Sequence, residues 1–365
     1  MQTAGGYAAF VPAPLPPDLS YSPALVLSLS QADAAIGELS GLGRQLPNPH
    51  LLIAPYIRRE AVLSSRIEGT RASLSDLWLE EAELGQSEDS DVREVRNYVE
   101  ALEHGLERLH DLPLSLRLVR ELHGRLMGGV RGSQATPGEF RRSQNWIGPA
   151  GSTPATAPYV PPPPDVMMDC LASWEKFLHD RDRFPDLIQC ALMHENFEAI
   201  HPFLDGNGRV GRLLITLFLV ERGRLSQPLL YVSDYIESRR QEYYDSLQRV
   251  RTDGDWGGWL HFFLKAVEDT ARAGVRQAGQ LMDLRETFRR RLSRKPSALK
   301  LLDELFLNPY LTVERAARIL KSSQPTARQA VASLQQEGLL SEVSGRKWRR
   351  IYLARPILES VEGRA

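Results

Sequence analysis

The stretch HPFLDGNGRVGR, residues 201 to 212, contains a histidine, an aspartate, a Gly-Asn-Gly turn and two arginines. Residues 184 to 200 have a helical pattern that leads straight into it, and RLLITLFLVERG follows, apolar on almost every side. An apolar pattern all round a helix indicates burial on most faces. We therefore expect the stretch to join two helices at the centre of a mainly α fold.

The Gly206-Asn207-Gly208 turn has the features of a phosphate-binding site. Unpaired backbone N–H groups and the positive end of a helix dipole meet at the start of the second helix. Glycines allow an anion to approach the backbone closely, and Arg209 and Arg212 lie on neighbouring parts of one helical face. Two arginines suit a polyphosphate better than a single carboxylate ligand.

Asp205 and His201 supply the remaining chemistry of a phosphate-transfer site. One carboxylate, with phosphate oxygens and waters, is a common way to hold Mg²⁺. A histidine with a near-neutral pKa can accept the proton of an attacking hydroxyl. A capped helix start with solvated arginines is the alternative, but it would not require five chemical types in one turn. The stretch also fits G-x-G-x-x-G, yet it follows a helix and not the strand that a dinucleotide site requires.

The composition is that of an ordinary globular protein, with 365 residues, 42% hydrophobic, 25% charged and a formal net charge of -1. Nucleic-acid binding must therefore be local. Only Cys170 and Cys190 are present, and His194 lies seven positions before His201 instead of the four of a zinc-protease helix. We expect neither a disulfide framework nor a zinc site. Without a leader or a membrane-length apolar run, we expect a cytoplasmic protein with no membrane partner.

The helical pattern is interrupted once. Residues 136 to 165 are rich in glycine and proline, and they predict a β-hairpin flap with short strands at Phe140, Trp146 and Ile147 and at Tyr159 and Val160. The chain then divides into an N-terminal helical region (1–110), a core (111–275), a helical linker (276–294) and a C-terminal domain (295–365).

The C-terminal domain reads as helix, helix, short turn, helix and hairpin, which is the order of a winged helix-turn-helix. Thr326, Arg328 and Gln329 open the helix that would enter the DNA major groove, and Arg346 and Lys347 in the wing would contact phosphates. A protein-docking or dimerising role for this domain is an equal alternative.

HPFLDGNGRVGR resembles the Fic (Fic/Doc) family signature H-x-F-x-[DE]-G-N-G-R-x-x-R at every defined position. The resemblance implies a Fic-type helical core in which His201 deprotonates a Ser, Thr or Tyr hydroxyl of a target protein. Asp205 would bind Mg²⁺ bridging the α- and β-phosphates of ATP. Gly206, Asn207 and Gly208 would form the anion hole, and Arg209 and Arg212 would contact the outer phosphates.

Further nucleotide contacts follow from the same resemblance. Gly211 and the pair Tyr243 and Tyr244 would lie beside the nucleotide, although Arg239-Arg240 stands where relatives often carry Asn-Arg. In the Doc branch a lysine replaces the glycine before the first arginine, and a phosphate is transferred. Gly208 argues against that branch.

The segment SSRIEGT, residues 64 to 70, resembles the family's inhibitory motif [ST]-x-x-x-E-[GN] through Ser64, Glu68 and Gly69. A carboxylate at a helix C-terminus meets an unfavourable dipole and needs an opposite charge. The resemblance implies that Glu68 pairs with Arg212 and so occupies the guanidinium that the γ-phosphate needs. An ordinary exposed glutamate before a helix-ending glycine is the alternative.

The flap resembles the family's target-docking hairpin, in which an extended target segment pairs with the strand edge at Trp146, Ile147 and Gly148. The sequence therefore predicts an autoinhibited protein adenylyltransferase that uses ATP and Mg²⁺ on a target protein or on itself, with homodimerisation as a further expectation. The alternatives are a DNA-binding regulator with a nucleotide-sensing core, and a Fic enzyme that removes AMP or transfers another nucleotide monophosphate.

Overall fold

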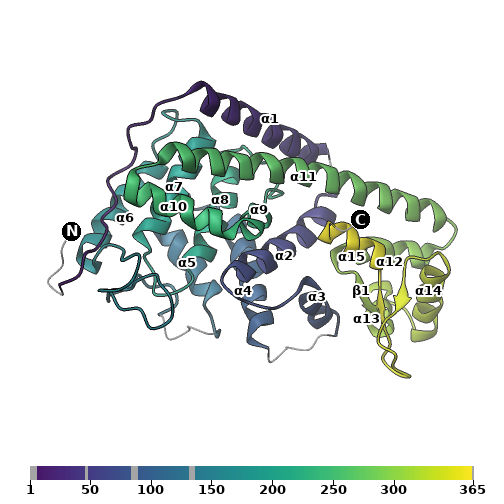
Figure 1. The fold of residues 1–365 in the computed structure, drawn as a ribbon. Helices are drawn as coiled ribbons and strands as arrows, with labels where there is room; N and C mark the ends of the chain where they lie inside the picture. The colour runs from purple at the N-terminus through teal and green to yellow at the C-terminus, as the bar shows by residue number, and fades with distance from the viewer. Residues whose placement is uncertain (1–5, 46–47, 84–88, 131–135, 364–365) are drawn as a thin grey trace.

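The structure is a computed structural model that describes residues 6–45, 48–83, 89–130 and 136–363. Its helices are α1 (Pro23–Gln45), α2 (His50–Ile67), α3 (Leu74–Glu83), α4 (Ser90–Arg108), α5 (Leu116–Leu126), α6 (Pro164–Leu178), α7 (Asp186–Ile200), α8 (Asn207–Glu221), α9 (Ser233–Ser238), α10 (Arg240–Asp253), α11 (Trp256–Arg291), α12 (Pro296–Leu307), α13 (Val313–Leu320), α14 (Gln324–Gln336) and α15 (Arg355–Glu362). The strands are β1 (Tyr310–Thr312), β2 (Ser341–Glu342) and β3 (Ile351–Leu353). The fold is mainly helical, as the sequence predicts (Figure 1).

Helices α7 and α8 form the centre of the fold and carry the two ends of the motif. The α7 helix is buried without interruption from Leu187 to Ile200, and α8 is buried from Arg209 to Leu219. Helices α1, α6 and α11 pack on α7, whereas α2, α4 and α5 pack on α8. Because other helices cover α7 and α8 on most sides, neither central helix shows a polar face in its sequence.

The long helix α11 passes along α1 and then continues toward the C-terminal elements (Figure 1). It is one 36-residue helix that runs across the predicted boundary between core and linker. Its second half buries Ala278, Leu281 and Phe288, so this part belongs to the packed structure and is not a free linker. None of the described helices combines the length and the apolar character needed to span a bilayer.

The C-terminal elements follow one another as helix, strand, helix, helix and hairpin. The three strands form an antiparallel sheet in the order β1-β3-β2, with Tyr310 and Ser341 both paired with Leu353. Helix α12 packs on α2, β1 packs on α3, and α15 packs on both α11 and α2. The segment from α12 to α15 is therefore packed directly against the N-terminal helices.

The flap contains less strand than the sequence predicts. Within described residues 136–165, the ladder is reduced to one bridge, in which Ile147 N donates to Tyr159 O at 2.8 Å and Tyr159 N donates to Ile147 O at 3.3 Å. The expected strands are wrong because the prolines of this segment remove donors and fix φ on both sides of the bridge. The N-terminal segment covers one side of the flap, since Phe10 N donates to Val160 O at 2.8 Å.

Candidate active site

The motif forms a loop between α7 and α8 with unusual backbone geometry at both ends. His201 ends α7 in the left-handed region, at φ 49°, and Gly206 precedes α8 at φ 79°. Glycine adopts a positive φ readily, whereas a histidine must be held there by its surroundings. The Asn207 side chain fixes the loop from inside, since its Oδ1 accepts from Phe203 N and its Nδ2 donates to Phe203 O, each at 2.8 Å.

His123 on α5 supports this loop, and no sequence motif marks it. Its ring stacks on Phe203 at 3.7 Å between centroids. Its Nδ1 accepts from Gly138 N at 2.9 Å, which leaves the Nε2 proton to be donated to Asp205 O at 3.0 Å. Burial lowers the pKa of His123 to about 4, so the ring is neutral at pH 7 in a single tautomer. A lone histidine on the apolar face of α5 is the signal that could have identified it.

His201 is placed to act as a proton acceptor. Burial lowers its pKa to about 3, and the positive charges of Arg251 and Arg141 lower it further. The imidazole is therefore neutral at physiological pH. Its buried Nδ1 has no hydrogen-bond partner among the described residues. A neutral imidazole can take a proton through a ring nitrogen that a bound hydroxyl reaches.

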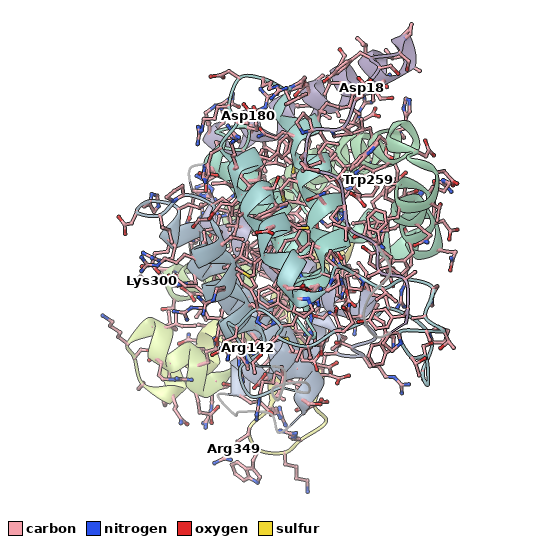
Figure 2. All side chains as sticks on the ribbon, turned by 90° about the vertical axis from the view of Figure 1, so that its left-hand side faces the viewer. Asp18, Arg142, Asp180, Trp259, Lys300 and Arg349 are labelled. Atoms are coloured by element: carbon pink, nitrogen blue, oxygen red, sulfur yellow. The ribbon has the colours of Figure 1, made fainter. Side chains whose placement is uncertain are left out.

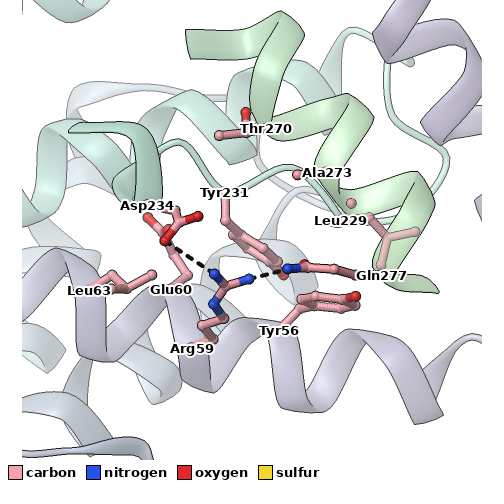
Figure 3. Close-up of a pocket in the computed structure, with 11 residues that line it drawn as sticks. Tyr56, Arg59, Glu60, Leu63, Leu229, Tyr231, Asp234, Thr270, Ala273 and Gln277 are labelled. Atoms are coloured by element: carbon pink, nitrogen blue, oxygen red, sulfur yellow. Dashed lines mark hydrogen bonds and ion pairs between the residues drawn. The ribbon is translucent and has the colours of Figure 1, made fainter. Parts of the chain in front are cut away.

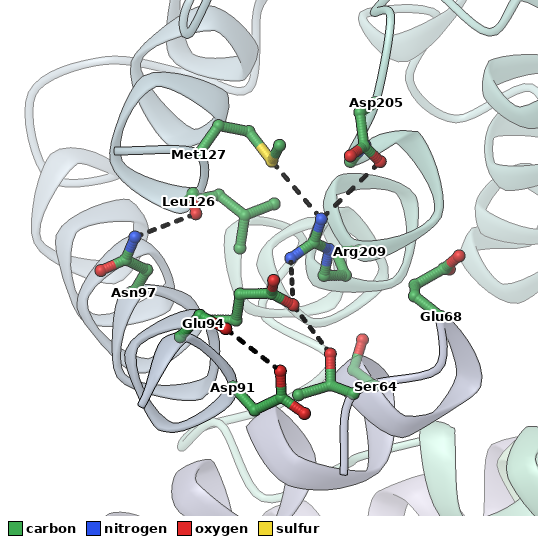
Figure 4. A network of polar contacts seen from close by, with 12 residues as sticks. Ser64, Glu68, Asp91, Glu94, Asn97, Leu126, Met127, Asp205 and Arg209 are labelled. Carbon is green, nitrogen blue, oxygen red and sulfur yellow. Dashed lines mark hydrogen bonds and ion pairs between the residues drawn. The ribbon is translucent and has the colours of Figure 1, made fainter. Parts of the chain in front are cut away.

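Arg209 is buried beside the turn, where Glu94, Asp205 and Met127 surround its guanidinium (Figure 4). Its Nη1 lies 3.5 Å from Glu94 Oε2, and its Nη2 lies 3.8 Å from Asp205 Oδ1 and 3.4 Å from Met127 Sδ. Neither Nε nor Nη1 has a hydrogen-bond partner in the described part of the chain. A buried guanidinium with free donors is suited to receive an anion.

Arg212 forms the ion pair with Glu68 that the sequence analysis expected. Only 1% of the Arg212 side chain is exposed, and its Nη2 lies 2.7 Å from Glu68 Oε1. Nε and Nη2 also donate to Ser64 Oγ and Ser64 O, each at 2.9 Å. Burial alone would raise the pKa of Glu68, but the Arg212 guanidinium holds it below its usual value. Glu68 is therefore ionised in this structure.

The Glu68 carboxylate lies directly against the backbone of the turn. A Cβ added at Gly208 would collide with Glu68 Oε1 and would lie 2.9 Å from Arg212 Nη1. Only glycine allows this approach. Gly69 follows Glu68 at φ 98°, where a side chain would be strained. The three residues that resemble the family's inhibitory motif, Ser64, Glu68 and Gly69, thus lie at the end of α2, next to the turn.

Asp205 is the only motif residue suited to a metal ion. Its side chain is 53% exposed, and its Oδ1 accepts from Gly206 N at 2.6 Å. Within the described residues, no group of three or more His, Cys, Asp or Glu side chains could hold a metal. The site therefore fits a cation that takes most of its ligands from phosphate and water, as Mg²⁺ does.

The structure does not support nucleotide contacts for two predicted residues. The Gly211 carbonyl accepts from His194 Nδ1 at 3.0 Å, and a Cβ there would lie 2.5 Å from Glu198 Oε1. Tyr243 is buried and donates through its hydroxyl to His194 Nε2 at 2.8 Å. Gly211 on α8 and Tyr243 on α10 therefore lie on the faces of these helices that pack into the core. Tyr244, 39% exposed, is the member of the pair that a ligand can reach.

The predicted docking residues lie at an exposed edge. Trp146, Ile147 and Gly148 are all exposed, and the Ile147 bridge to Tyr159 leaves their outer side uncovered by the flap itself. A Cβ at Gly148 would lie 2.8 Å from Pro158 Cδ and Ser152 Oγ, so a glycine is needed here for these parts of the flap to pack this closely.

The candidate DNA-binding residues are on the surface of the C-terminal segment. Thr326, Arg328 and Gln329 are exposed in the first turns of α14, and Lys347 is exposed in the hairpin. Arg349 projects from the hairpin tip (Figure 2). Arg346 already pairs within the chain, with its Nη1 2.9 Å from Glu83 Oε1.

A small cavity of about 30 Å³ lies away from the motif, between α2, α11 and the segment before α9. Figure 3 shows Arg59 inside it, where it reaches Gln277 Oε1 at 3.0 Å and Asp234 Oδ1 at 3.1 Å. The buried Tyr56 hydroxyl, which lines it, has no hydrogen-bond partner among the described residues. Such a volume suits about one or two waters and is too small for a nucleotide.

Comparison with known proteins identifies two matching family profiles. The one described as Fic/DOC family N-terminal covers residues 26–107, and the one described as Fic/DOC family covers residues 113–219. The protein adenylyltransferase Fic of Aedes aegypti is 31% identical over 159 residues, 43% of this chain and 28% of the relative. That of Drosophila virilis is 31% identical over 162 residues, 44% of this chain and 30% of the relative. The chain thus spans less than a third of the length of these curated relatives.

Solved structures share the fold. A Fic family protein from Desulfovibrio desulfuricans G20 matches with a TM-score of 0.61 and 21% identity, over 93% of this chain and 98% of that one. Fic-1 from C. elegans matches with a TM-score of 0.53 and 20% identity, over 72% of this chain and 75% of that one. The matched profiles include both the end of α2 and the turn after α7, which are the two parts of the site. The chain belongs to the Fic/DOC family.

Proposed function

We propose that the protein is an adenylyltransferase that transfers AMP from ATP to a Ser, Thr or Tyr hydroxyl of a target protein. The observation that carries this proposal is a neutral His201 beside a glycine turn with two buried arginines. The relatives named protein adenylyltransferase Fic support the same activity. Gly208 supports AMP transfer over phosphate transfer, since the Doc branch carries a lysine there.

In the proposed reaction His201 accepts the proton of the target hydroxyl as its oxygen attacks the α-phosphorus. A bond forms between this oxygen and phosphorus, the bond to the bridging oxygen of the β-phosphate breaks, and pyrophosphate leaves. The N–H groups at the start of α8 and the Arg209 guanidinium stabilise the developing charge. Asp205 would hold Mg²⁺, which supplies charge neutralisation on the phosphates when bound.

We further propose that Glu68 inhibits the reaction in this state. Its carboxylate occupies Arg212 and lies against Gly208, where an outer phosphate of ATP would bind. A carboxylate and a phosphate cannot share one guanidinium and one turn, because like charges repel at this distance. ATP must therefore displace Glu68 or bind in a form that cannot react.

The test uses ATP labelled at the α-phosphate, Mg²⁺ and the full-length chain, with transfer to protein as the readout. Glu68→Gly should raise labelling at least about 10-fold, because it frees a charge-assisted contact. Glu68→Gln should give an intermediate rate, since it removes the charge but keeps the volume. Adding His201→Ala to Glu68→Gly should abolish labelling.

Equal labelling in the Glu68→Gly protein with and without His201 would refute the proposed mechanism. Mass spectrometry of the product distinguishes AMP from another nucleotide monophosphate. Incubation of an AMP-modified target with wild-type protein tests for AMP removal.

A second candidate function is DNA binding by the C-terminal segment, with the turn serving as a nucleotide sensor. The exposed Thr326, Arg328 and Gln329 on α14 favour it, together with the order of elements from α12 to the hairpin. A duplex probe should bind wild-type protein with a strong salt dependence, and Arg328→Ala should weaken this binding. Absence of binding at low salt would eliminate this candidate.

A further inference from the structure

Arg141, at the start of the flap, is a buried cation that the functional motif does not include. Its side chain donates only to main-chain carbonyls. Nε donates to His201 O at 2.9 Å, Nη2 donates to Ile200 O at 3.4 Å and to Pro162 O, and Nη1 donates to Ser143 O at 3.3 Å. One guanidinium thus joins the end of α7 to both sides of the flap.

These hydrogen bonds stabilise the backbone at His201, where α7 ends. The last carbonyls of a helix lack intrahelical donors, and positive charge is favourable at that end. His201 also occupies the left-handed region, which is strained for a residue with a Cβ. Burial lowers the pKa of Arg141 to about 10, so its guanidinium is still charged at neutral pH. It can therefore hold these carbonyls in place.

Neighbouring groups hold the same loop from the flap side. Arg141 N donates to Pro202 O at 2.9 Å, and Asn145 Nδ2 donates to Phe203 O at 2.8 Å. The Tyr159 hydroxyl donates to Ala199 O at 2.6 Å. The bridge that carries the exposed docking edge and the backbone that carries His201 are therefore parts of one hydrogen-bonded unit.

We propose that Arg141 is a positioning residue for AMP transfer, one that holds the His201 backbone and fixes the imidazole relative to the flap edge. The inference rests on the proposed function, because it concerns the same base. A target strand bound at the edge would then present its hydroxyl to a base at a set distance. A misplacement of about 1 Å between reacting groups reduces a rate by roughly 100-fold.

A purely structural role for Arg141 makes a different prediction. Every hydrogen bond that Arg141 makes through its side chain goes to residues 143, 162, 200 and 201 within the described chain, and none goes to the turn at 206–212. Disturbing the base should therefore lower kcat and leave ATP binding unchanged. General loosening of the fold would weaken ATP binding and lower the melting temperature together with kcat.

The experiment compares Arg141→Lys and Arg141→Ala with Arg142→Lys, all in the Glu68→Gly protein. Arg142, labelled in Figure 2, is the matched control, since it is the next residue but its side chain is 87% exposed and forms an ion pair with Glu139. Lysine keeps the charge but cannot reach carbonyls on both sides. The readouts are kcat, KM for ATP, the dissociation constant for ATP, and thermal unfolding.

Arg141→Lys should lower kcat by about 10- to 100-fold with the KM and the dissociation constant for ATP within about 2-fold of the parent. Arg142→Lys should match the parent in every readout. The proposal is overturned if Arg141→Lys keeps the parental kcat, or if kcat and ATP affinity fall together with the melting temperature. Arg141→Ala should lower kcat further, provided that it unfolds cooperatively.

A spectroscopic readout separates this proposal from the proposed function. The imidazole resonances of His201 can be assigned by their loss in His201→Ala and followed without turnover. They should shift in Arg141→Lys and stay unchanged in Arg142→Lys. If Glu68→Gly transfers no AMP, the proposed function is wrong. If the His201 resonances stay unchanged in Arg141→Lys, the positioning role is wrong, whatever the outcome of the AMP-transfer assay.

Discussion

Three glutamates are buried near the motif, each with an unusual ionisation. Burial raises the pKa of Glu60, Glu195 and Glu198 to about 7, although hydrogen bonds from Ser233 to Glu60 and the charge of Arg251 near Glu195 act in the opposite direction. The folded protein therefore holds protons on these groups at a pH where the unfolded chain has released them. Their contribution to stability is complete below the unfolded-state pKa and is lost as the pH rises through about 7.

Glu198 provides the cleanest test at this scale, because its Oε1 has no hydrogen-bond partner among the described residues. Glu198→Gln removes the titration and keeps the shape. The variant should be more stable than wild type by roughly 1–3 kcal/mol at pH 8, and this difference should shrink to below about 1 kcal/mol at pH 5. Chemical denaturation at the two pH values measures it.

The exposed Glu107, changed to Gln, is the control, and its effect should be small and equal at both pH values. A Glu198→Gln protein that gains nothing at pH 8 would show that Glu198 is already ionised and solvated in the folded state.

At the scale of elements, the end of α2 carries Glu68, the proposed inhibitory carboxylate, and also Ser64, which binds the same Arg212 guanidinium. Ser64 accepts from Arg212 through both its side chain and its main chain. Ser64→Ala removes the hydroxyl acceptor and loosens the pair that Glu68 makes. Labelling should therefore rise above wild type but stay below Glu68→Gly, measured in the same assay.

Ser65→Ala is the matched control for this prediction. Ser65 is the next residue on α2 and is also buried, but its Oγ has no hydrogen-bond partner in the described chain. If Ser64→Ala and Ser65→Ala raise labelling equally, the cause is a general disturbance of α2 and not the loss of the hydrogen bond between Ser64 and Arg212.

Much of this arrangement can be predicted at the level of elements. The motif predicted its own position between two helices from local spacing, whereas the contact between Glu68 and Arg212 was implied by the resemblance of residues 64 to 70 to the family's inhibitory motif. The flap strands were wrong since prolines limit pairing to one bridge. The orientation of each position about its helix was harder to predict: Gly211 and Tyr243 face the core, and local spacing does not determine the rotation of α8 and α10. Arg141 and His123 were missed because their partners are main-chain atoms far along the chain.

At the scale of the whole molecule, the contact between the C-terminal segment and α3 depends on Asn308. This buried side chain donates to Trp78 O at 2.9 Å, and its Oδ1 accepts from Tyr310 N at 2.9 Å. Asn308→Ala removes both hydrogen bonds and takes the side-chain acceptor from Tyr310 N, and it should lower the free energy of unfolding by about 1–3 kcal/mol.

Arg346→Ala breaks a second polar contact between the same parts, the exposed pair with Glu83. It should change the free energy of unfolding by less than about 1 kcal/mol, because exposed ion pairs contribute little. Urea denaturation measures both variants. A larger loss in Arg346→Ala than in Asn308→Ala would contradict this order.

The sequence predicted the C-terminal helices and hairpin but not their packing on α2 and α3. Hydrophobic periodicity shows that a helix has a buried face without showing which neighbour covers it. The single helix α11 is a similar case, since the sequence placed a domain boundary at residues 275 and 276, inside this helix.

The close approach of Glu68 to Gly208 has a consequence for how the protein responds to its surroundings. A blocking group on the same chain has an effective local concentration on the order of millimolar or more. Under the proposed inhibition by Glu68, dilution of the protein would leave the block in place, and ATP would have to compete with it at millimolar levels. The basal rate per molecule is therefore expected to be independent of protein concentration, and a change in the position of α2 is a more effective release than a rise in nucleotide.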